Sequence, residues 1–130
     1  MAKSPGHRQF PDHQVRETRL RGTVVVAEMD GQVIAESNDV IRVDEDKAPP
    51  RYYFPSDAIR AARLTRTKTN TVCPFKGTAS YYDLSLGHRH LSDAVWSYDD
   101  PYDEHRDLQG RLAFYDDQYP EIQIRQHPSG

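Results

Sequence analysis

The chain has little cysteine and no long hydrophobic run, and both absences exclude whole classes of protein. One Cys in 130 residues allows no intrachain disulfide and no zinc site built from several thiolates of this chain. No apolar stretch reaches the roughly 20 residues that a membrane-spanning helix needs, and no signal-peptide pattern opens the sequence. We therefore expect a cytoplasmic protein that does not contact membranes.

An excess of positive charge is also missing. The 17 Lys and Arg residues face 20 Asp and Glu residues, so the net charge of −3 gives no general attraction to nucleic acid. One local basic run, Arg60, Arg63, Arg66 and Lys68, is the exception, but no exposed aromatic residues are interleaved with it. We interpret this run as a solvated surface and expect no nucleic-acid partner.

The length and the ends of the chain indicate a single folded domain. Residues 1–17 contain Pro5, Gly6 and Pro11 and show no periodicity, which predicts a flexible arm or a segment that wraps over the domain surface. Residues 127–130 are interpreted as a tail in the same way. Residues 18–126 are expected to form the domain itself.

Strand patterns dominate this domain. Runs of β-branched residues at 23–29 and 32–36 flank Asp30-Gly31, a strong signal for a tight hairpin. Further strands are predicted at 40–43, 51–54, 78–84, 91–98, 110–115 and 121–125. Ser56 is a good N-cap for the one predicted helix, a short one that ends near residue 62 or 63. The fold class is therefore mainly β.

The single Cys lies close to a lysine in a constrained stretch. Cys73-Pro74-Phe75-Lys76-Gly77 places an ammonium near a thiol, and an ammonium can stabilise the thiolate that nucleophilic or redox catalysis needs. Pro74 favours an extended Cys73, and Gly77 permits a sharp turn. Cys73 and Lys76 are therefore the candidate catalytic residues. The alternative is that Cys73 is a small buried hydrophobe and Lys76 an ordinary ion-paired lysine.

Aromatic residues supply a second candidate set. Alternate residues of a strand share a face, so the patterns predict that Tyr81 lies beside Trp96 or Tyr98. Such a wall, with Tyr53 added, suits stacking against a flat ligand. The alternative is that these rings are simply the core of a small domain that has few aliphatic residues.

A pair of histidines offers a third, weaker possibility. His88 and His90 have the His-x-His spacing that zinc and copper sites use, and His105 with Asp93 or Asp103 is a possible complement. Gly87 indicates an exposed hairpin tip, where solvated histidines are more common than metal ligands. We expect no bound metal and no cofactor.

Several motifs in a fixed order resemble one family. Residues 50–55 (PRYYFP), 73–77 (CPFKG), 79–81 (ASY) and 94–98 (AVWSY), with Pro101, are similar to domain of unknown function 427 over residues 24–115. The resemblance implies a compact β-tent, or Mss4-like, domain in which two antiparallel sheets surround a central pocket. Relatives of that fold often hold a structural zinc on two Cys-x-x-Cys turns, and with Cys73 alone this zinc is expected to be absent. The family also has a nucleotidyltransferase label, but this sequence lacks the paired carboxylates for two magnesium ions.

These observations lead to one functional hypothesis and one rival. The hypothesis is a small-molecule-binding domain, catalytic through its thiol if chemistry occurs, whose pocket is lined by Tyr53, Cys73, Lys76, Tyr81, Trp96 and Tyr98. The rival is a non-catalytic protein-interaction module in which the same residues form a closed core and an apolar patch is exposed elsewhere. Either a monomer or a homodimer is compatible with the sequence.

Overall fold

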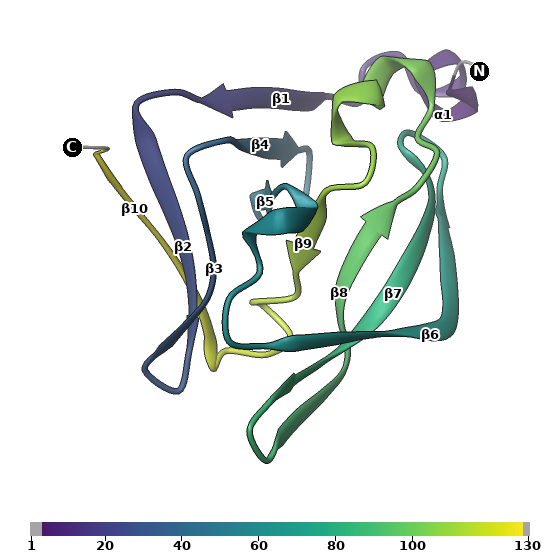
Figure 1. Cartoon of the computed structure of the whole chain (residues 1–130). Coiled ribbons are helices and arrows are strands. Elements are labelled where there is room, and N and C mark those ends of the chain that lie inside the picture. The colour runs from purple at the N-terminus through teal and green to yellow at the C-terminus, as the bar shows by residue number, and fades with distance from the viewer. Residues whose placement is uncertain (1–3, 129–130) are drawn as a thin grey trace.

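The computed structural model describes residues 4–128 and contains three antiparallel sheets (Figure 1). The first sheet has the order β1 (Val15–Leu20), β4 (Val40–Glu45) and β5 (Arg51–Tyr53). The second has the order β10 (Ile122–Pro128), β2 (Thr23–Met29) and β3 (Gln32–Ser37). The third has the order β6 (Arg63–Cys73), β7 (Gly77–Leu86), β8 (Arg89–Tyr98) and β9 (Leu112–Phe114).

Three short helical segments complete the described chain. They are the α-helix α1 (Pro5–Gln9) and the 3-10 segments η1 (Ser56–Ala58) and η2 (Asp103–Leu108). Within residues 4–128, no helix is long and apolar enough to cross a membrane.

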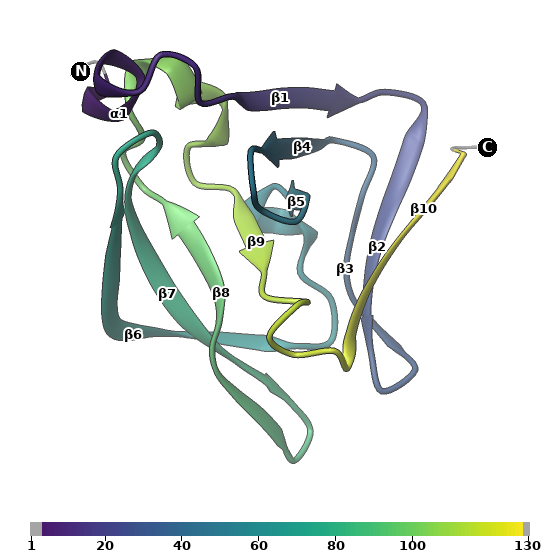
Figure 2. The same ribbon diagram turned by 180° about the vertical axis from the view of Figure 1, so that it is seen from behind.

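The second and third sheets lie on opposite sides of the molecule, and the first sheet lies across one end of the space between them (Figures 1 and 2). The first and third sheets are joined where β5 meets β9. The backbone N–H of Phe54 donates to the carbonyl oxygen of Leu112, and the N–H of Leu112 donates back to Phe54, both at 2.8 Å. This bridge fixes how the faces of the two sheets approach each other.

The prediction of a mainly β fold is confirmed, and so is the hairpin at Asp30-Gly31. β2 pairs with β3 on either side of that turn. Asp30 and Gly31 have φ values of 54° and 77°, the left-handed conformation that a primed turn requires at both central positions. The strand predicted at 40–43 is confirmed as part of β4, and those at 78–84 and 91–98 as parts of β7 and β8.

The prediction of two sheets is wrong, because the described chain forms three. The sequence reading missed β1 and β6. β6 is an edge strand whose residues are mostly exposed, so it lacks the apolar alternation by which a half-buried strand is recognised. Its residues Arg63, Arg66 and Lys68 were interpreted as the end of a helix and a solvated basic run.

The predicted helix from Ser56 is also shorter than expected. Only Ser56–Ala58 are helical, in a single 3-10 turn. Ile59 is already extended, with φ −68° and ψ 134°, and Ala61 adopts the left-handed φ of 59°, so neither residue continues a helix, and β6 starts at Arg63. At the other end of the chain, the segment expected to be a flexible arm or a surface wrap contains α1 and the first residues of β1.

Two hydrophobic clusters form the core. The larger cluster is built mainly from the second and third sheets and includes Phe54 and Phe114, whose rings meet edge to face at 5.5 Å. The other is contributed by the first sheet, the third sheet and η2, and we call it the aromatic cluster. Its buried members are Ile41, Val43, Tyr53, Ala79, Tyr81, Trp96, Tyr98, Leu108 and Ala113.

Candidate ligand-binding cavity

A cavity of about 180 Å³ adjoins the aromatic cluster between the first and third sheets. This volume is below the range typical of drug-sized ligands and suits a molecule of about one ring. The lining residues come from β4, β5, β7, β8 and the connections around them. They are Val43, Glu45, Ala48, Pro49, Arg51, Tyr53, Lys76, Tyr81, Trp96, Tyr98 and Tyr115.

Strand register places the aromatic side chains of β7 and β8 side by side. Tyr81 is paired directly with Trp96, and Ala79 is paired with Tyr98. The predicted neighbourhood of Tyr81 and Trp96 is therefore confirmed. Because Ala79 is small, the ring of Tyr98 has room to lie beside β7 and reach the cavity.

Tyr53 closes the cavity from the first sheet. The indole N–H of Trp96 donates to the Tyr53 hydroxyl at 3.1 Å, and the two rings meet edge to face at 6.3 Å. Burial raises the pKa of both Tyr53 and Tyr98 far above the usual range for tyrosine. Both phenols are therefore neutral at physiological pH, and their hydroxyls can serve as hydrogen-bonding groups.

Arg51 forms a cationic wall of the same cavity. Its guanidinium carbon lies 5.0 Å from the centroid of Trp96 and 5.4 Å from that of Tyr115. The carboxylate of Asp117 accepts hydrogen bonds from Arg51 at 2.8 and 3.3 Å, and these bonds lower the pKa of Asp117. Burial, together with the neighbouring phenol of Tyr81, raises the pKa of Tyr115 to about 12.

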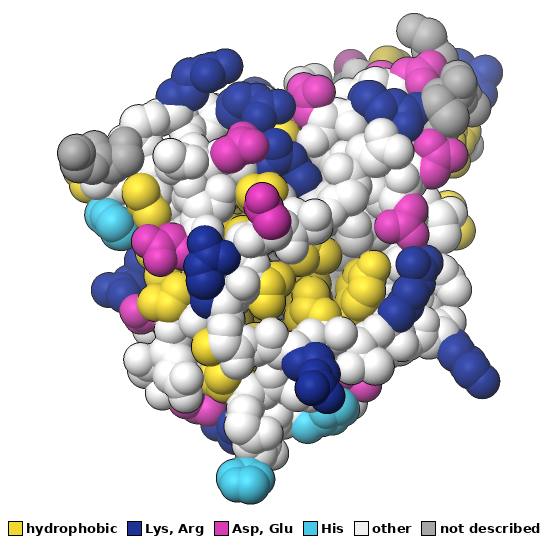
Figure 3. All heavy atoms as spheres, viewed as in Figure 1, with side chains coloured by type: hydrophobic (Ala, Val, Ile, Leu, Met, Phe, Trp, Pro, Cys, Tyr) yellow, Lys and Arg dark blue, Asp and Glu magenta, His cyan; other side chains and the backbone are white. Residues whose placement is uncertain are grey.

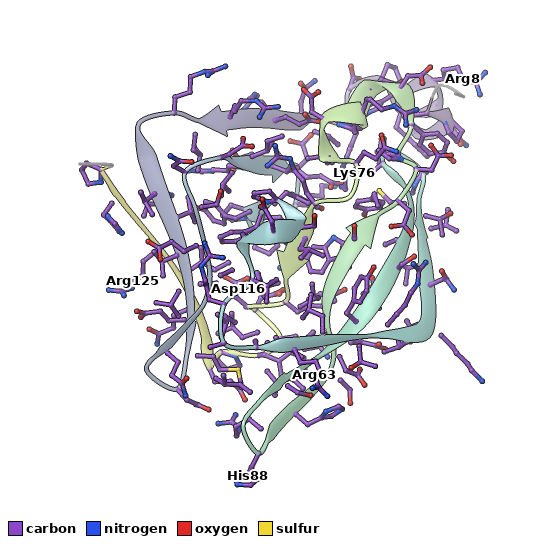
Figure 4. All side chains as sticks on the ribbon, in the orientation of Figure 1. Arg8, Arg63, Lys76, His88, Asp116 and Arg125 are labelled. Carbon is purple, nitrogen blue, oxygen red and sulfur yellow. The ribbon has the colours of Figure 1, made fainter. Side chains whose placement is uncertain are left out.

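Lys76 supplies a second cation, and its ammonium is buried. The Nζ atom lies 2.5 Å from Oε1 of Glu45, and only 8% of the lysine side chain is exposed. The other carboxylate oxygen, Oε2, contacts Nε2 of His13 at 3.0 Å. Burial tends to raise the pKa of Glu45, but the bonds to Lys76 and His13 outweigh it and lower the pKa overall. Lys76 lies inside the ribbon, between the first and third sheets (Figure 4).

Glu45 lines the cavity but is not among the candidate residues predicted from the sequence. It is the last residue of β4. It follows Ile41 and Val43 at two-residue intervals, so the strand carries its carboxylate to the face that bears those buried side chains. Extending the alternation of 40–43 by two residues would have found it.

Cys73 lies near the cavity but is not among its lining residues. It ends β6, is paired with Gly77 across the turn, and packs against the aromatic cluster as a partly buried residue. Gly77 has φ 127°, a conformation that favours glycine, but the sharp turn is formed by residues 74–76 and so includes Lys76 rather than following it. The turn thus brings Cys73 and Lys76 to one end of the cluster, and only Lys76 contributes to the cavity wall. A catalytic role for either residue stays a prediction.

The candidate histidine pair lies elsewhere. His88 is at the tip of the β7–β8 hairpin, far from Lys76 (Figure 4). His90 contacts Asp83 at 3.2 Å and Ser85 at 3.1 Å, both on the neighbouring strand β7. Among residues 4–128, no group of three or more His, Cys, Asp or Glu side chains is placed to hold a metal ion.

The binding hypothesis requires side chains that reach a pocket, whereas the interaction-module hypothesis requires a closed core. The exposure of the cavity residues lies between these two expectations. Taken as whole residues, Tyr53, Lys76, Trp96 and Tyr98 are between 1% and 6% exposed, as core residues would be, yet all four line the cavity. Hydrophobic side chains also surface in the middle of one face, between β5 and β6, with charged residues around them (Figure 3).

A separate groove of about 600 Å³ lies beside the N-terminal segment. It includes Phe10, which is 53% exposed, together with His13 and Phe75. Most of its lining residues are exposed, so it is an open surface rather than an enclosed site.

Comparison with known protein families gives a match that covers most of the chain. A family model described as domain of unknown function (DUF427) matches residues 15–125, which include every residue that lines the cavity. A search of curated proteins finds no match for the chain.

Proposed function

The chain belongs to the family described as domain of unknown function 427, and we propose that it binds a small, flat organic molecule in the aromatic cavity. The ligand carries a carbonyl or carboxylate oxygen that accepts a hydrogen bond from Lys76. One observation carries the proposal: the ammonium of Lys76 is held in the wall of a cavity that is otherwise lined largely by aromatic rings.

The lining suits the body of such a ligand. Five of its residues are aromatic, Tyr53, Tyr81, Trp96, Tyr98 and Tyr115. Rings stack on planar ligands and bury apolar area at little entropic cost, and phenol hydroxyls fix the orientation.

The polar groups suit one oxygen-bearing substituent. An ammonium has three N–H donors and Glu45 accepts one of them, which leaves donors for a ligand oxygen. A carbonyl group can share Lys76 with Glu45, whereas a carboxylate has to compete with Glu45 for it. Arg51 is already neutralised by Asp117, so it favours a planar face rather than a second anionic group.

Two finer statements are also proposals. The resemblance implies a β-tent, or Mss4-like, fold, and the meeting of two sheets around a cavity supports it. Thiol chemistry at Cys73 ranks behind simple binding, because the Lys76 ammonium that would stabilise a thiolate is paired with Glu45 instead.

Trp96 makes the proposal testable, because it is the only tryptophan in the chain and lies in the cavity wall. Single-ring carboxylates, amides and ketones are titrated against the protein while its tryptophan fluorescence is recorded. We expect saturable quenching by members of this set. Lys76→Met should weaken binding about tenfold or more, because a charged hydrogen bond in a buried site is lost.

Lys68→Met is the matched control, since Lys68 is exposed on β6 and lies outside the cavity. This variant should bind like the wild type. Failure of every fragment to quench Trp96, or equal affinity in Lys76→Met and the wild type, would contradict the proposal. The interaction module would then be the better account.

A further inference from the structure

The N-terminal segment is fastened to two elements that are distant in sequence. The Ser4 hydroxyl donates to the carbonyl oxygen of Pro74 at 2.7 Å, and the Gly6 N–H donates to the same oxygen at 2.8 Å. The backbone N–H of Ser4 also donates to Oε1 of Glu104 at 3.0 Å. Both ribbon views show α1 beside the β6–β7 turn and beside the segment that carries η2 (Figures 1 and 2).

Two histidine rings form a further link of this docked segment. Nε2 of His7 lies 2.9 Å from Nε2 of His105. His105 is only 3% exposed, and its Nδ1 lies 2.6 Å from a carboxylate oxygen of Glu17 on β1. Because a carboxylate accepts, the Nδ1 of His105 carries a hydrogen. A neutral His105 therefore accepts the Nε2–H of His7.

This arrangement tolerates one added proton but not two. With one proton, His105 donates from both nitrogens and His7 accepts at Nε2 in its other tautomer. With two protons, an N–H on each ring points at the other across 2.9 Å. The hydrogen bond is then lost, and two positive charges face each other at a partly buried site.

The surroundings of His7 oppose the second proton. Burial is the main cause that lowers the pKa of His7, and the charge of His105 lowers it further. Glu104 on η2 raises it, while His13 and Lys76 lower it slightly. Glu17 on β1 faces His105 rather than His7. The net direction is downward from the ordinary value of 6.5.

Through His13, the same segment contacts Glu45, a residue of the cavity wall. The imidazole of His13 stacks on Phe75, with ring centroids 4.2 Å apart, and contacts Oε2 of Glu45 at 3.0 Å. The other oxygen of Glu45 holds Lys76. Docking of the segment thus adds a partner to the acid that positions the cavity lysine.

We propose that residues 4–13 form a latch that opens on acidification. Uptake of a second proton by the His7–His105 pair releases the segment and takes His13 away from Glu45. The effect on the cavity rests on the proposed function, whereas the release itself does not. Once His13 has left, Lys76 is the remaining partner of the Glu45 carboxylate. Glu45 then competes more strongly with a ligand oxygen for the Lys76 ammonium, so ligand affinity falls.

The sign of the pH dependence follows from proton binding. In the released segment the ring of His7 takes up a proton at the ordinary pKa of 6.5, whereas in the docked segment the pKa of His7 is lowered. The released state therefore binds more protons. Docking is complete above pH 6.5, the ordinary pKa of histidine, and is lost as the pH falls below it through the lowered pKa of His7.

Amide hydrogen exchange by NMR on the whole chain tests the release without any ligand. After correction for intrinsic rates, we expect protection of the Gly6 and Phe10 amides at about pH 8 and a loss of about tenfold or more at about pH 5. The amide of Ala27 in β2 should stay protected. Unchanged protection of Gly6 between the two pH values would overturn the latch.

Two variants should show the docked and the released segment, respectively, at both pH values. His7→Gln keeps a donor but cannot become charged, so its segment should stay docked at both pH values. Gly6→Ala should be released at both, because a Cβ at that position would lie 2.7 Å from the carbonyl oxygen of Pro74. His88→Gln, at the hairpin tip, is the control and should respond like the wild type. Loss of protection in His7→Gln on acidification, equal to that in the wild type, would overturn the proposal.

A second measurement covers the case in which His7→Gln is released at every pH. The ring resonances of His7 and His105 are followed in the wild type as the pH falls. The latch requires that the second protonation coincides with the loss of Gly6 protection, and full protonation of both rings in a docked segment would overturn it. Because none of these readouts uses a ligand, their failure would leave fragment binding at Trp96 intact. Weaker fragment binding in Gly6→Ala than in the wild type is the expected consequence for the cavity.

Discussion

The ammonium of Lys76 and the carboxylate of Glu45 are 2.5 Å apart, although the two residues are separated by 31 positions in the chain. One lies in the turn after β6 and the other at the end of β4, so the pair connects the first and third sheets. It brings the only buried lysine of the described chain to the cavity wall.

Glu45→Gln should destabilise the protein at neutral pH. The substitution leaves the buried ammonium of Lys76 without a charged partner, and we expect a loss of about 2 kcal/mol in the free energy of unfolding, since Glu45 is partly exposed. Denaturant unfolding at pH 7 measures this loss. Asp44→Asn is the control, because the side chains of Asp44 and its partner Arg42 are more exposed, at 34% and 38%, and it should cost less than about 0.5 kcal/mol.

The same variant has a defined pH dependence. The pKa of Glu45 is lowered in the folded state, so its contribution is complete above its ordinary pKa of 4.5 and is lost as the pH falls through the lowered value. The difference in stability between wild type and Glu45→Gln should therefore shrink below pH 4.5. A difference that grows on acidification would refute this assignment.

Tyr53→Phe should leave the indole N–H of Trp96 buried and without its acceptor. We expect a loss of about 1–2 kcal/mol in unfolding free energy together with a shift in tryptophan emission. Tyr52→Phe is the matched control, because the Tyr52 hydroxyl accepts from Gln126 at an exposed site. Equal effects of the two substitutions would show that the Trp96 hydrogen bond contributes little.

Raised tyrosine pKa values predict loss of stability at alkaline pH. Three of the eight tyrosines, Tyr53, Tyr98 and Tyr115, favour the neutral form in the folded state. Their contribution is complete below the ordinary pKa of 10 and is lost as the pH rises above it. Phenolate absorbance should show fewer ionised tyrosines in native than in unfolded protein at about pH 11. Tyr115→Phe should remove the ionisation step near 12, and its persistence would contradict the assignment.

Asp93 should stabilise the irregularity in the pairing of β7 with β8. Its carboxylate oxygens each accept from a hydroxyl of β6, Thr67 and Thr69, at 2.6 Å, and its φ of 50° lies at an irregularity of β8. Asp93→Asn keeps the tolerance for that φ but removes one acceptor, so we expect a loss of about 1 kcal/mol in thermal or denaturant unfolding. Asp99→Asn, whose ion pair with Arg66 is exposed, should be nearly neutral. Equal losses in Asp93→Asn and Asp99→Asn would show that the hydrogen bonds of Asp93 stabilise the protein no more than an exposed ion pair does.

Patterns of local sequence predicted the central strands and the neighbouring positions of Tyr81 and Trp96. They did so because β7 and β8 are largely buried, so both sequences are rich in the apolar and aromatic residues that are typical of strands. β6 could not be predicted in the same way, since it is a mostly exposed edge strand that is held by its backbone pairing and by Asp93 and has few apolar side chains in contact with the core.

The polar half of the cavity was harder to predict than the aromatic half. Lys76 was identified from its place between Pro74 and Gly77, but its partner Glu45 belongs to another sheet. His13 and His7 lie in a segment without periodicity, and their roles depend on contacts with Phe75 and His105 that only the fold creates.

The most direct test of the cavity as a ligand site is the NMR resonance of the Trp96 indole N–H during titration with a single-ring carboxylate such as benzoate, or with the matching amide. This resonance is unique because the chain has one tryptophan. We predict a saturable shift of the indole N–H with companion shifts at Lys76 and Tyr98, and none at the hairpin tip around His88. An unmoved indole resonance, or shifts confined to exposed surfaces, would contradict the account.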